Sequence, residues 1–329
     1  MRTRKPLIFA SLLFGSAIAM SVSWYIRGSD PAPKADPVLI KVAQGDGLSA
    51  VLTKLEDKRA INSAAAVGLM VRFKGLKPKL TPGTYRVIPG SEIPTIFTQL
   101  QTPFQIAVRV PEGWWIRRVA ERLESQGFCK AEDYIALAND PARFQKQVKF
   151  KLPAKTLEGY LFPDTYHLDP DDGAEQLIAK QLASFGKRVI PLVNEPNKVH
   201  RALVIGSMVE AEVAKSHERS KVAGIIENRL RIRMPLQIDA TVLYALQKWQ
   251  VLGPGVVNKV DSPYNTYRIP GLPPGPIGSP GLASIEAALK PATTDKLYYV
   301  ALPDQSHLFA RTYAEHLANI RKARAATRG

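Results

Sequence analysis

The chain has 329 residues, and 45 Lys and Arg against 29 Asp and Glu give it a formal net charge of +16. Its single cysteine, Cys129, excludes an intrachain disulfide and any cysteine-based zinc or iron–sulfur cluster. A chain of this length holds about two domains of ~150 residues. The positive charge indicates an anionic partner such as nucleic acid, anionic lipid or a cell-wall polymer. Because the basic residues are not gathered into one tract, the net charge indicates the environment in which the protein works and not the reaction that it catalyses.

The N-terminal segment has the pattern of a membrane anchor. Residues 6–26 contain no charged side chain, and about 20 apolar residues are needed to cross ~30 Å of hydrocarbon as a helix. Basic residues gather before this run, at Arg2, Arg4 and Lys5, and aromatic Trp24 and Tyr25 lie at its far end. This asymmetry predicts a cytoplasmic tip, a single-pass helix over 1–27, and the rest of the chain outside the cytoplasm.

A cleaved signal peptide is the competing interpretation, because Ala17-Ile18-Ala19 resembles a cleavage site of small residues. The apolar run continues past that site and ends in aromatic residues, so we favour an uncleaved anchor. Residues 28–37 are rich in Pro and Asp, which predicts a linker.

A repeat follows the linker. The pattern Val-x-x-Gly-x-x-φ-x-x-φ-x-x-x-Leu, in which φ is Ile, Leu or Val, begins at Val42, Val87 and Val110, each time after a short alternating run. Alternation indicates a strand, and spacings of three and four indicate a helix. Residues 38–128 are therefore predicted to hold three units of strand, glycine turn and helix. They form either a LysM-like module that binds N-acetylglucosamine chains or a packing scaffold without a ligand. Trp114-Trp115 is the feature that hints at sugar stacking.

Common catalytic motifs are absent from the second half. The sequence has no HExxH, Walker loop, GxGxxG or GxSxG, and its five histidines lack metal-ligand spacing. We therefore predict neither a metal nor a cofactor, and carboxylates remain as the candidates for chemistry.

Glu210 is the strongest of these carboxylates. Residues 201–216 are predicted to form a buried helix, because Gly206 is their only helix breaker and apolar residues cover more than one face. No residue three, four or seven positions before Glu210, or three or four after it, is charged. Burial in such a setting raises the pKa of a carboxyl group, as a general acid requires. Glu212 has Lys215 three residues later, which predicts an ordinary surface pair.

Several segments then combine into a pattern that resembles the endolytic murein transglycosylases of the MltG (YceG-like) family. They occur in the family's order, and the predicted anchor and LysM-like region match its layout. The segments are LEGYLFPDTY (157–166), SMVE (207–210), HERSKVA (217–223), NRL (228–230), LQIDATV (236–242), YNTY (264–267) and GLPPGPI (271–277).

This resemblance implies a lyase anchored in the bacterial inner membrane, with its catalytic domain on the periplasmic side. Such an enzyme cuts nascent peptidoglycan internally, between N-acetylmuramic acid and N-acetylglucosamine, leaves 1,6-anhydromuramoyl ends and so terminates strand elongation. The fold expected is α+β, with the anchor, a LysM-like module over 38–128 and a catalytic domain over 129–329. Glycan strands are the expected partner, with peptidoglycan synthases nearby at the membrane and no nucleic acid.

The family's catalytic glutamate corresponds to Glu210. Further residues with groups suited to sugar hydroxyls and faces are expected in the cleft: Glu158, Gln237, Asp239, Asn265 and Tyr267. The sequence departs from the family at Ala240, where Pro is usual, at Glu227 and at a Pro-Gly segment over 253–255. We expect these departures to alter loops rather than chemistry.

Two other functions remain open at this stage. Ordinary glycosidases use two carboxylates, so a muramidase-type hydrolase would pair Glu210 with Glu158 or Asp239. A wall-binding scaffold without activity is the second. One carboxylate suffices for a lytic transglycosylase, because the muramoyl 6-hydroxyl attacks its own anomeric carbon and replaces water.

Overall fold

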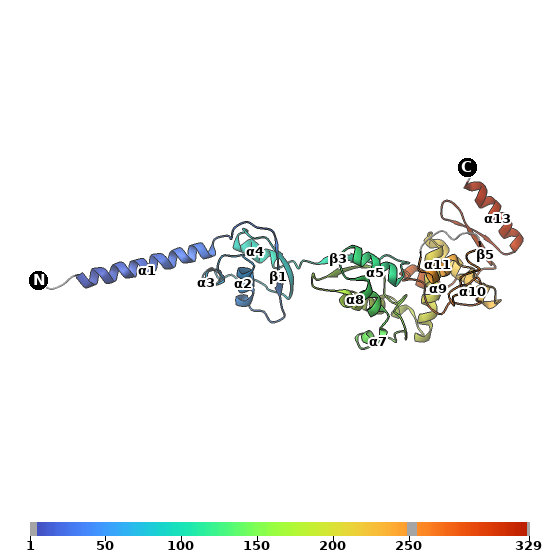
Figure 1. Ribbon diagram of the computed structural model, residues 1–329, viewed down its shortest axis with the longest axis horizontal. Helices are drawn as coiled ribbons and strands as arrows, with labels where there is room; N and C mark the ends of the chain where they lie inside the picture. Colours follow the sequence, from blue (N-terminus) through green and yellow to red (C-terminus); the bar gives the residue numbers. More distant parts are fainter. Residues whose placement is uncertain (1–4, 249–254, 328–329) are drawn as a thin grey trace. The chain divides into compact units, whose positions relative to one another are not determined.

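The computed structural model describes residues 5–248 and 255–327, with side chains described from Ser16 onward. Arg2 and Arg4 of the predicted anchor and Gly253 of the Pro-Gly segment lie outside the described residues. The chain divides into two compact units (Figure 1), one ending at Ile106 and including Asp169–Asp171, the other holding the remainder. The described residues form helices and three two-stranded sheets, so the predicted α+β class is confirmed.

The predicted membrane-spanning run is helical and belongs to α1 (Lys5–Ser29). The end of this helix packs against α3 (Ala64–Phe73), where the rings of Tyr25 and Phe73 meet edge to face with centroids 6.5 Å apart. In the part of the chain whose side chains are described, no helix combines the length and the apolar character needed to span a membrane.

The first unit contains two of the predicted strand–helix repeats. Its elements are α1, β1 (Val38–Val42), α2 (Leu48–Asp57), α3, β2 (Gly83–Val87) and α4 (Ile93–Gln99). Strands β1 and β2 pair antiparallel, with Val38 opposite Val87. Alternate residues of both strands face a core that the helices close, as the period of two in their sequences predicts.

The third predicted repeat also forms a strand and a helix, β3 (Ile106–Arg109) and α5 (Ile116–Ser125), but nearly all of it belongs to the second unit. The glycine of the pattern has the same role in all three strand–helix repeats. Gly45, Gly90 and Gly113 have φ of 90°, 83° and 73°. This left-handed backbone is open to glycine at little cost, which explains why the sequence pattern keeps a glycine between strand and helix.

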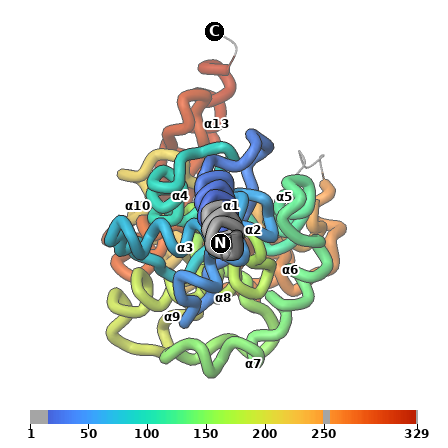
Figure 2. The backbone as a smooth tube through the Cα atoms, turned by 90° about the vertical axis from the view of Figure 1, so that its left-hand side faces the viewer, coloured from blue at the N-terminus to red at the C-terminus, as the bar shows by residue number. Residues whose placement is uncertain are grey.

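The second unit begins with β3 and α5 and has two hydrophobic cores. Figure 2 shows α5 beside α6, and these helices pack with α8 around buried Tyr134, Phe144 and Phe185. The elements in this part are α6 (Ala131–Ala138), α7 (Pro141–Phe144), η1 (Gln145–Gln147), β4 (Thr165–Leu168), which pairs with β3, α8 (Ala174–Arg188), η2 (Ile190–Leu192) and η3 (Pro196–Lys198).

The second core lies around α9, which carries Glu210. The elements that follow along the chain are α9 (Val199–Glu212), η4 (Ser216–Glu218), α10 (Arg219–Arg231), α11 (Asp239–Leu246), α12 (Leu282–Leu289), β5 (Tyr298–Ala301), β6 (His307–Ala310) and α13 (Tyr313–Ala326). Strands β5 and β6 form an antiparallel pair, with Tyr298 opposite Ala310.

Helix α9 is buried, as predicted, but it ends at Glu212 instead of 216, because Val213 turns into extended backbone. Its one glycine, Gly206, allows close packing against α12. A Cβ at this position would lie 3.3 Å from the carbonyl oxygen of Ser284 and 3.4 Å from Cα of Ile285. Glu210 therefore sits in the last turn of a helix that α12 holds in place.

Asn228 and Arg229 of α10 brace this core. The Asn228 side chain donates to the carbonyl of Thr294 at 2.8 Å, and Arg229 donates to those of Leu297 at 2.7 Å and Leu236 at 2.6 Å. Both side chains thus tie α10 to the segments that precede β5 and α11.

Gly224→Ala is expected to lower the free energy of unfolding of the second unit by about 2 kcal/mol, since overpacked sites cost ~1–3 kcal/mol. A Cβ on Gly224 of α10 would lie 2.2 Å from the carbonyl oxygen of Ala292, a backbone atom that cannot rotate away. Differential scanning calorimetry of the full chain measures this change. Gly68→Ala in α3 is the control, because its Cβ would meet only Cδ1 of Leu52 at 3.7 Å. Equal effects of both substitutions would contradict the packing argument.

Candidate active site

The carboxylate of Glu210 lies at the C-terminal end of α9, and its side chain is only 8% exposed. Nη2 of Arg219, from the start of α10, donates to Oε1 at 3.1 Å, and the backbone N–H of Gly281 donates to Oε2 at 3.0 Å. The apolar setting predicted from the helical neighbours is therefore wrong in one respect. A cation and an N–H reach Glu210 from segments that are distant in the sequence.

The turn between β3 and α5 packs against Glu210 from another side. A Cβ on Gly113 would lie 3.5 Å from Cγ of Glu210. The N–H of Gly113 donates to the carbonyl of Ser279 at 2.8 Å, and the N–H of Ser279 donates to that of Trp114 at 2.9 Å. The repeat glycine thus brings this turn, the segment before α12 and the glutamate together.

Glu112 in the same turn is a second carboxylate that sequence reasoning missed. It is exposed, yet it lies so close to Gly281 that a Cβ there would be 2.2 Å from its Oε1. Partial burial of its carboxyl group raises the pKa of Glu112, and the negative charge of Glu210 raises it further, against the opposite effect of Arg219. The position of Glu112 directly before the repeat glycine Gly113 is the sequence signal that points to this residue.

The two tryptophans of this turn are largely occupied by protein contacts. The guanidinium of Arg118 lies 4.1 Å from the centre of the Trp114 ring. Trp115 is buried and meets Tyr244 edge to face, with centroids 6.1 Å apart. Trp115 is therefore a core residue, and one face of Trp114 is covered by a cation.

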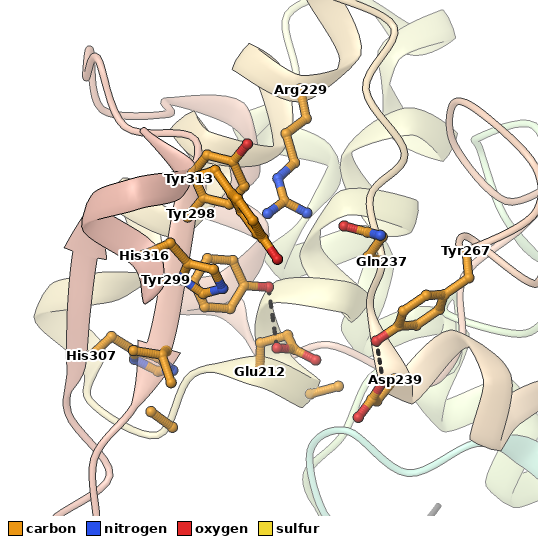
Figure 3. Close-up of a pocket in the computed structure, with 13 residues that line it drawn as sticks. Glu212, Arg229, Gln237, Asp239, Tyr267, Tyr298, Tyr299, His307, Tyr313 and His316 are labelled. Atoms are coloured by element: carbon orange, nitrogen blue, oxygen red, sulfur yellow. Dashed lines mark hydrogen bonds between the residues drawn. The ribbon is translucent and has the colours of Figure 1, made fainter. Parts of the chain in front are cut away.

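Glu210 lines a cavity of about 360 Å³, which we call the Glu210 cavity and which is also lined by Arg219, Leu302 and Gln305. A larger cavity of about 490 Å³ adjoins it, and Ala211, Glu212, Ala301 and His307 line both. We call the second one the tyrosine cavity. Its other lining residues are Arg229, Gln237, Asp239, Tyr267, Tyr298, Tyr299, Val300, Tyr313 and His316 (Figure 3).

Three of the five predicted sugar-binding residues meet in the tyrosine cavity. Gln237, Asp239 and Tyr267 line the same wall, and the Tyr267 hydroxyl donates to Oδ1 of Asp239 at 2.6 Å (Figure 3). Gln237 has a left-handed backbone with φ of 52°, and its N–H donates to the carbonyl of Thr266 at 3.1 Å. This pairing joins the LQID and YNTY segments, so the chain places their polar groups side by side.

The prediction that Glu212 forms a surface pair with Lys215 is wrong. Glu212 is the last residue of α9, so helical spacing no longer relates it to Lys215. Its carboxylate turns into the tyrosine cavity and accepts a hydrogen bond from the Tyr299 hydroxyl at 3.1 Å. Burial raises the pKa of Glu212 to about 7, with a further increase from the charge of Asp239.

Asn265 and Glu158 lie elsewhere. Asn265 is fully buried, and its side-chain nitrogen donates to the carbonyls of Val257 and Val260, both at 2.7 Å. It therefore fixes the loop that carries Tyr267. Glu158 is 4% exposed and accepts the N–H of Ile116, the first residue of α5, at 3.1 Å.

The cavity that Glu158 lines is a separate one of about 730 Å³. Its other lining residues include Tyr160, His200, Tyr264, Pro263, Pro274 and Pro276. Burial raises the pKa of Glu158 to about 8, against the lowering effect of hydrogen bonds from Ile116, Tyr244 and Gly159. The structure thus does not bring Glu158 into the two cavities next to Glu210.

Glu158→Gln is expected to stabilise the chain at pH 8 by about 1–3 kcal/mol. The pKa of this carboxyl rises from an ordinary 4.5 to about 8 on folding, so stability falls as the pH climbs from 4.5 through 8, and an amide removes that loss. Below pH 4 both side chains are neutral, and the two proteins should unfold alike. Thermal unfolding at both pH values measures the difference, with exposed Glu121→Gln as the control. A stabilisation that does not depend on pH would contradict the assignment to ionisation.

His307, which lines both cavities, is held by a buried hydrogen bond to Glu218. Nδ1 of His307 lies 2.7 Å from Oε2 of Glu218, and the His307 backbone N–H donates to Oε1 at 3.1 Å. Burial alone would raise the pKa of Glu218, but these bonds from His307 hold it below its usual value. Among the residues described, no group of three or more His, Cys, Asp or Glu is arranged to hold a metal ion.

The chain also matches a known protein family. The model of the YceG-like family matches residues 40–322. The chain belongs to the YceG-like family. The resemblance that the motifs indicated is therefore confirmed.

Two curated relatives of this YceG-like chain are named endolytic murein transglycosylase. The protein from Bacillus subtilis (strain 168) is 33% identical over 301 residues, which cover 85% of this chain and 82% of the relative. The protein from Streptococcus pneumoniae (strain D39) is 29% identical over 321 residues, and 58% of its length is covered. A crystal structure of a yceG-like protein from Listeria monocytogenes is similar with a TM-score of 0.59 and 31% identity, over 86% of this chain and 99% of that one.

Proposed function

We propose that this chain is an endolytic murein transglycosylase, a lyase that cuts the glycan strands of peptidoglycan internally. The observation that carries the proposal is the similarity to the Bacillus subtilis endolytic murein transglycosylase over 85% of the chain. This similarity is joined by a glutamate, Glu210, that lines a cavity beside a wall of aromatic and polar groups. Such groups suit the faces and hydroxyls of sugars.

Glu210 is the proposed acid and base. Its protonated carboxyl gives a proton to the glycosidic oxygen, and the bond from that oxygen to C1 of N-acetylmuramic acid breaks. The 6-hydroxyl of the same sugar attacks C1 and passes its proton to the Glu210 carboxylate, which restores the acid. The product keeps a 1,6-anhydro bond. The sugar supplies its own nucleophile, so neither water nor an enzyme nucleophile is needed.

Arg219 is the proposed positioning group for this step. Its guanidinium holds Oε1 of Glu210 at 3.1 Å, while the Gly281 N–H holds Oε2 at 3.0 Å. Two donors fix the plane of the carboxyl group and stabilise the negative charge that remains after proton donation. The guanidinium also adds one positive charge to a region that has Glu112, Glu210 and Glu212.

The tyrosine cavity is the proposed site for the sugars next to the bond that is cut. Gln237, Asp239 and Tyr267 offer hydrogen bonds and a ring face along one wall. Glu158 lines a different cavity, which favours the single-carboxylate mechanism over a hydrolase that pairs it with Glu210. A muramidase could still use Asp239 as its second carboxylate, and the ends of the products distinguish such a hydrolase from a transglycosylase.

The location follows from the proposed substrate. Peptidoglycan lies outside the cytoplasm, so we propose that the second unit acts there and that α1 anchors the chain in the inner membrane. The uncharged run over 6–26, with basic residues before it, supports this orientation. We also propose that β1, α2, α3 and β2 form a LysM-like module that contacts glycan, and that the enzyme works close to peptidoglycan synthases.

Mass spectrometry of the products tests the proposal. Full-length protein in detergent is incubated with purified sacculi, and the released fragments are analysed for their ends. The expected result is fragments with 1,6-anhydromuramoyl ends, drawn from the interior of strands. Reducing ends would instead identify a muramidase-type hydrolase. The absence of any cleavage, together with binding to sacculi, would identify a wall-binding scaffold.

A further inference from the structure

Glu212 is a carboxyl group that the mechanism above does not use, although it lines both the Glu210 cavity and the tyrosine cavity. It is partly buried and lies two residues after Glu210, where α9 ends. In Figure 3 it lies between Tyr299 on one side and the bonded pair Asp239 and Tyr267 on the other. A group at this place faces whatever occupies the tyrosine cavity.

One oxygen of Glu212 is held by the protein. The Tyr299 hydroxyl donates to Oε2 at 3.1 Å. Tyr299 is itself fixed, because it pairs with Phe309 across the β5–β6 ladder and its ring meets that of His307 edge to face, with centroids 5.5 Å apart. The carboxyl group is thus oriented through Oε2, and within the described part of the chain no hydrogen bond reaches Oε1.

We propose that Glu212 binds the glycan as a neutral acid, donating a hydrogen bond from its carboxyl O–H to the acetamido carbonyl oxygen of a sugar in the tyrosine cavity. This inference rests on the proposed function and names a second residue that recognises its substrate. Both sugars of peptidoglycan carry an N-acetyl group, and an amide oxygen is the strongest neutral acceptor that they offer. A carboxylate has no proton to donate.

The surroundings of Glu212 keep the neutral form available near physiological pH. Burial raises its pKa to about 7, and Asp239 at the start of α11 acts in the same direction. The Tyr299 hydroxyl and Arg229 of α10 act in the opposite direction.

Other titratable groups face the same two cavities. They are Glu210 of α9, Arg219 of α10, Tyr267, Tyr298 of β5, His307 of β6, and Tyr313 and His316 of α13. A pH profile of the wild type alone does not show which of these groups titrates. Substitution of Glu212 itself is therefore needed to assign a pH effect to this residue.

The experiment measures kcat and KM for full-length protein on soluble, peptide-free glycan strands between pH 5.5 and 8.5. Glu212→Ala is expected to raise KM about tenfold at pH 6, the loss of one hydrogen bond of ~1.4 kcal/mol. Glu212→Gln should recover most of that loss, because the amide N–H₂ replaces the carboxyl O–H. In the wild type, KM should rise as pH passes 7 and Glu212 ionises, whereas KM of the Gln variant should not.

Tyr299→Phe provides a second readout. It removes a donor that stabilises the Glu212 carboxylate, so the rise in KM should move to higher pH. Glu121→Gln, an exposed change of the same kind on α5, is the matched control and should follow the wild type.

Three results would overturn the inference. One is a Gln variant that has lost kcat as completely as Glu210→Gln, because Glu212 would then transfer a proton. Another is a Gln variant no better than the Ala variant. The third is a wild-type KM that stays flat between pH 5.5 and 8.5. A wild type that releases no anhydro ends would instead contradict the proposed function, so the two failures are distinguishable.

Discussion

Glu210→Gln is expected to lower kcat on sacculi by a factor of about 10³. General acid–base catalysis contributes a factor of ~10²–10⁴ to the rate of an enzyme. The amide has nearly the same shape as the carboxyl group and still accepts the Gly281 N–H, which donates to Oε2 at 3.0 Å in the native chain. It neither gives a proton to the glycosidic oxygen nor takes one from the 6-hydroxyl. The loss should therefore fall on kcat, with little change in binding.

Release of anhydromuramoyl fragments, followed by mass spectrometry against time, measures this rate. Exposed Glu121→Gln is the control for the loss of one negative charge, and thermal unfolding shows whether the Gln variant remains folded. If Glu210→Gln cuts strands at the native rate, Glu210 is not the acid, and Glu112 and Glu212, the other carboxylates beside it, become the candidates.

Arg219→Met is expected to lower the free energy of unfolding by about 3 kcal/mol, because removal of one partner of a buried ion pair leaves the other charge uncompensated. The side chains of Arg219 and Glu210 are 14% and 8% exposed, and the bond between them is 3.1 Å long. The guanidinium is not ideally satisfied either, since its Nε has no hydrogen-bond partner among the described residues.

The double variant Glu210→Gln/Arg219→Met separates these effects. With the Glu210 carboxylate gone as well, neither partner of the pair leaves an uncompensated charge, so the double variant should be more stable than Arg219→Met by about 1–3 kcal/mol. Urea unfolding of the four proteins measures the coupling energy of the pair. Additive effects would show that the 3.1 Å contact has no energetic role. Activity of Arg219→Met should also fall, because the Glu210 carboxyl loses one of its two orienting donors.

The sequence by itself determined the local elements of this protein. Alternating runs and spacings of three and four depend on residues close together along the chain, so the strand–helix repeats and the burial of α9 could be predicted from them. The glycines at 45, 90 and 113 follow for the same reason, since only the local backbone decides their φ. The segments that indicate the YceG-like family are likewise short and contiguous.

The tertiary structure alone decided which groups meet. Glu210 acquires Arg219 from α10 and the N–H of Gly281 through contacts across 9 and 71 residues of sequence, which no helical spacing reveals. Glu212 changed from an expected surface residue to a wall of the tyrosine cavity because α9 ends at that residue and β5 supplies Tyr299. Asn265 and Glu158 fell outside the two cavities because their side chains satisfy buried backbone groups. Electrostatics and burial depend on distance in space, so the pKa and the partners of each carboxyl group were fixed only by folding.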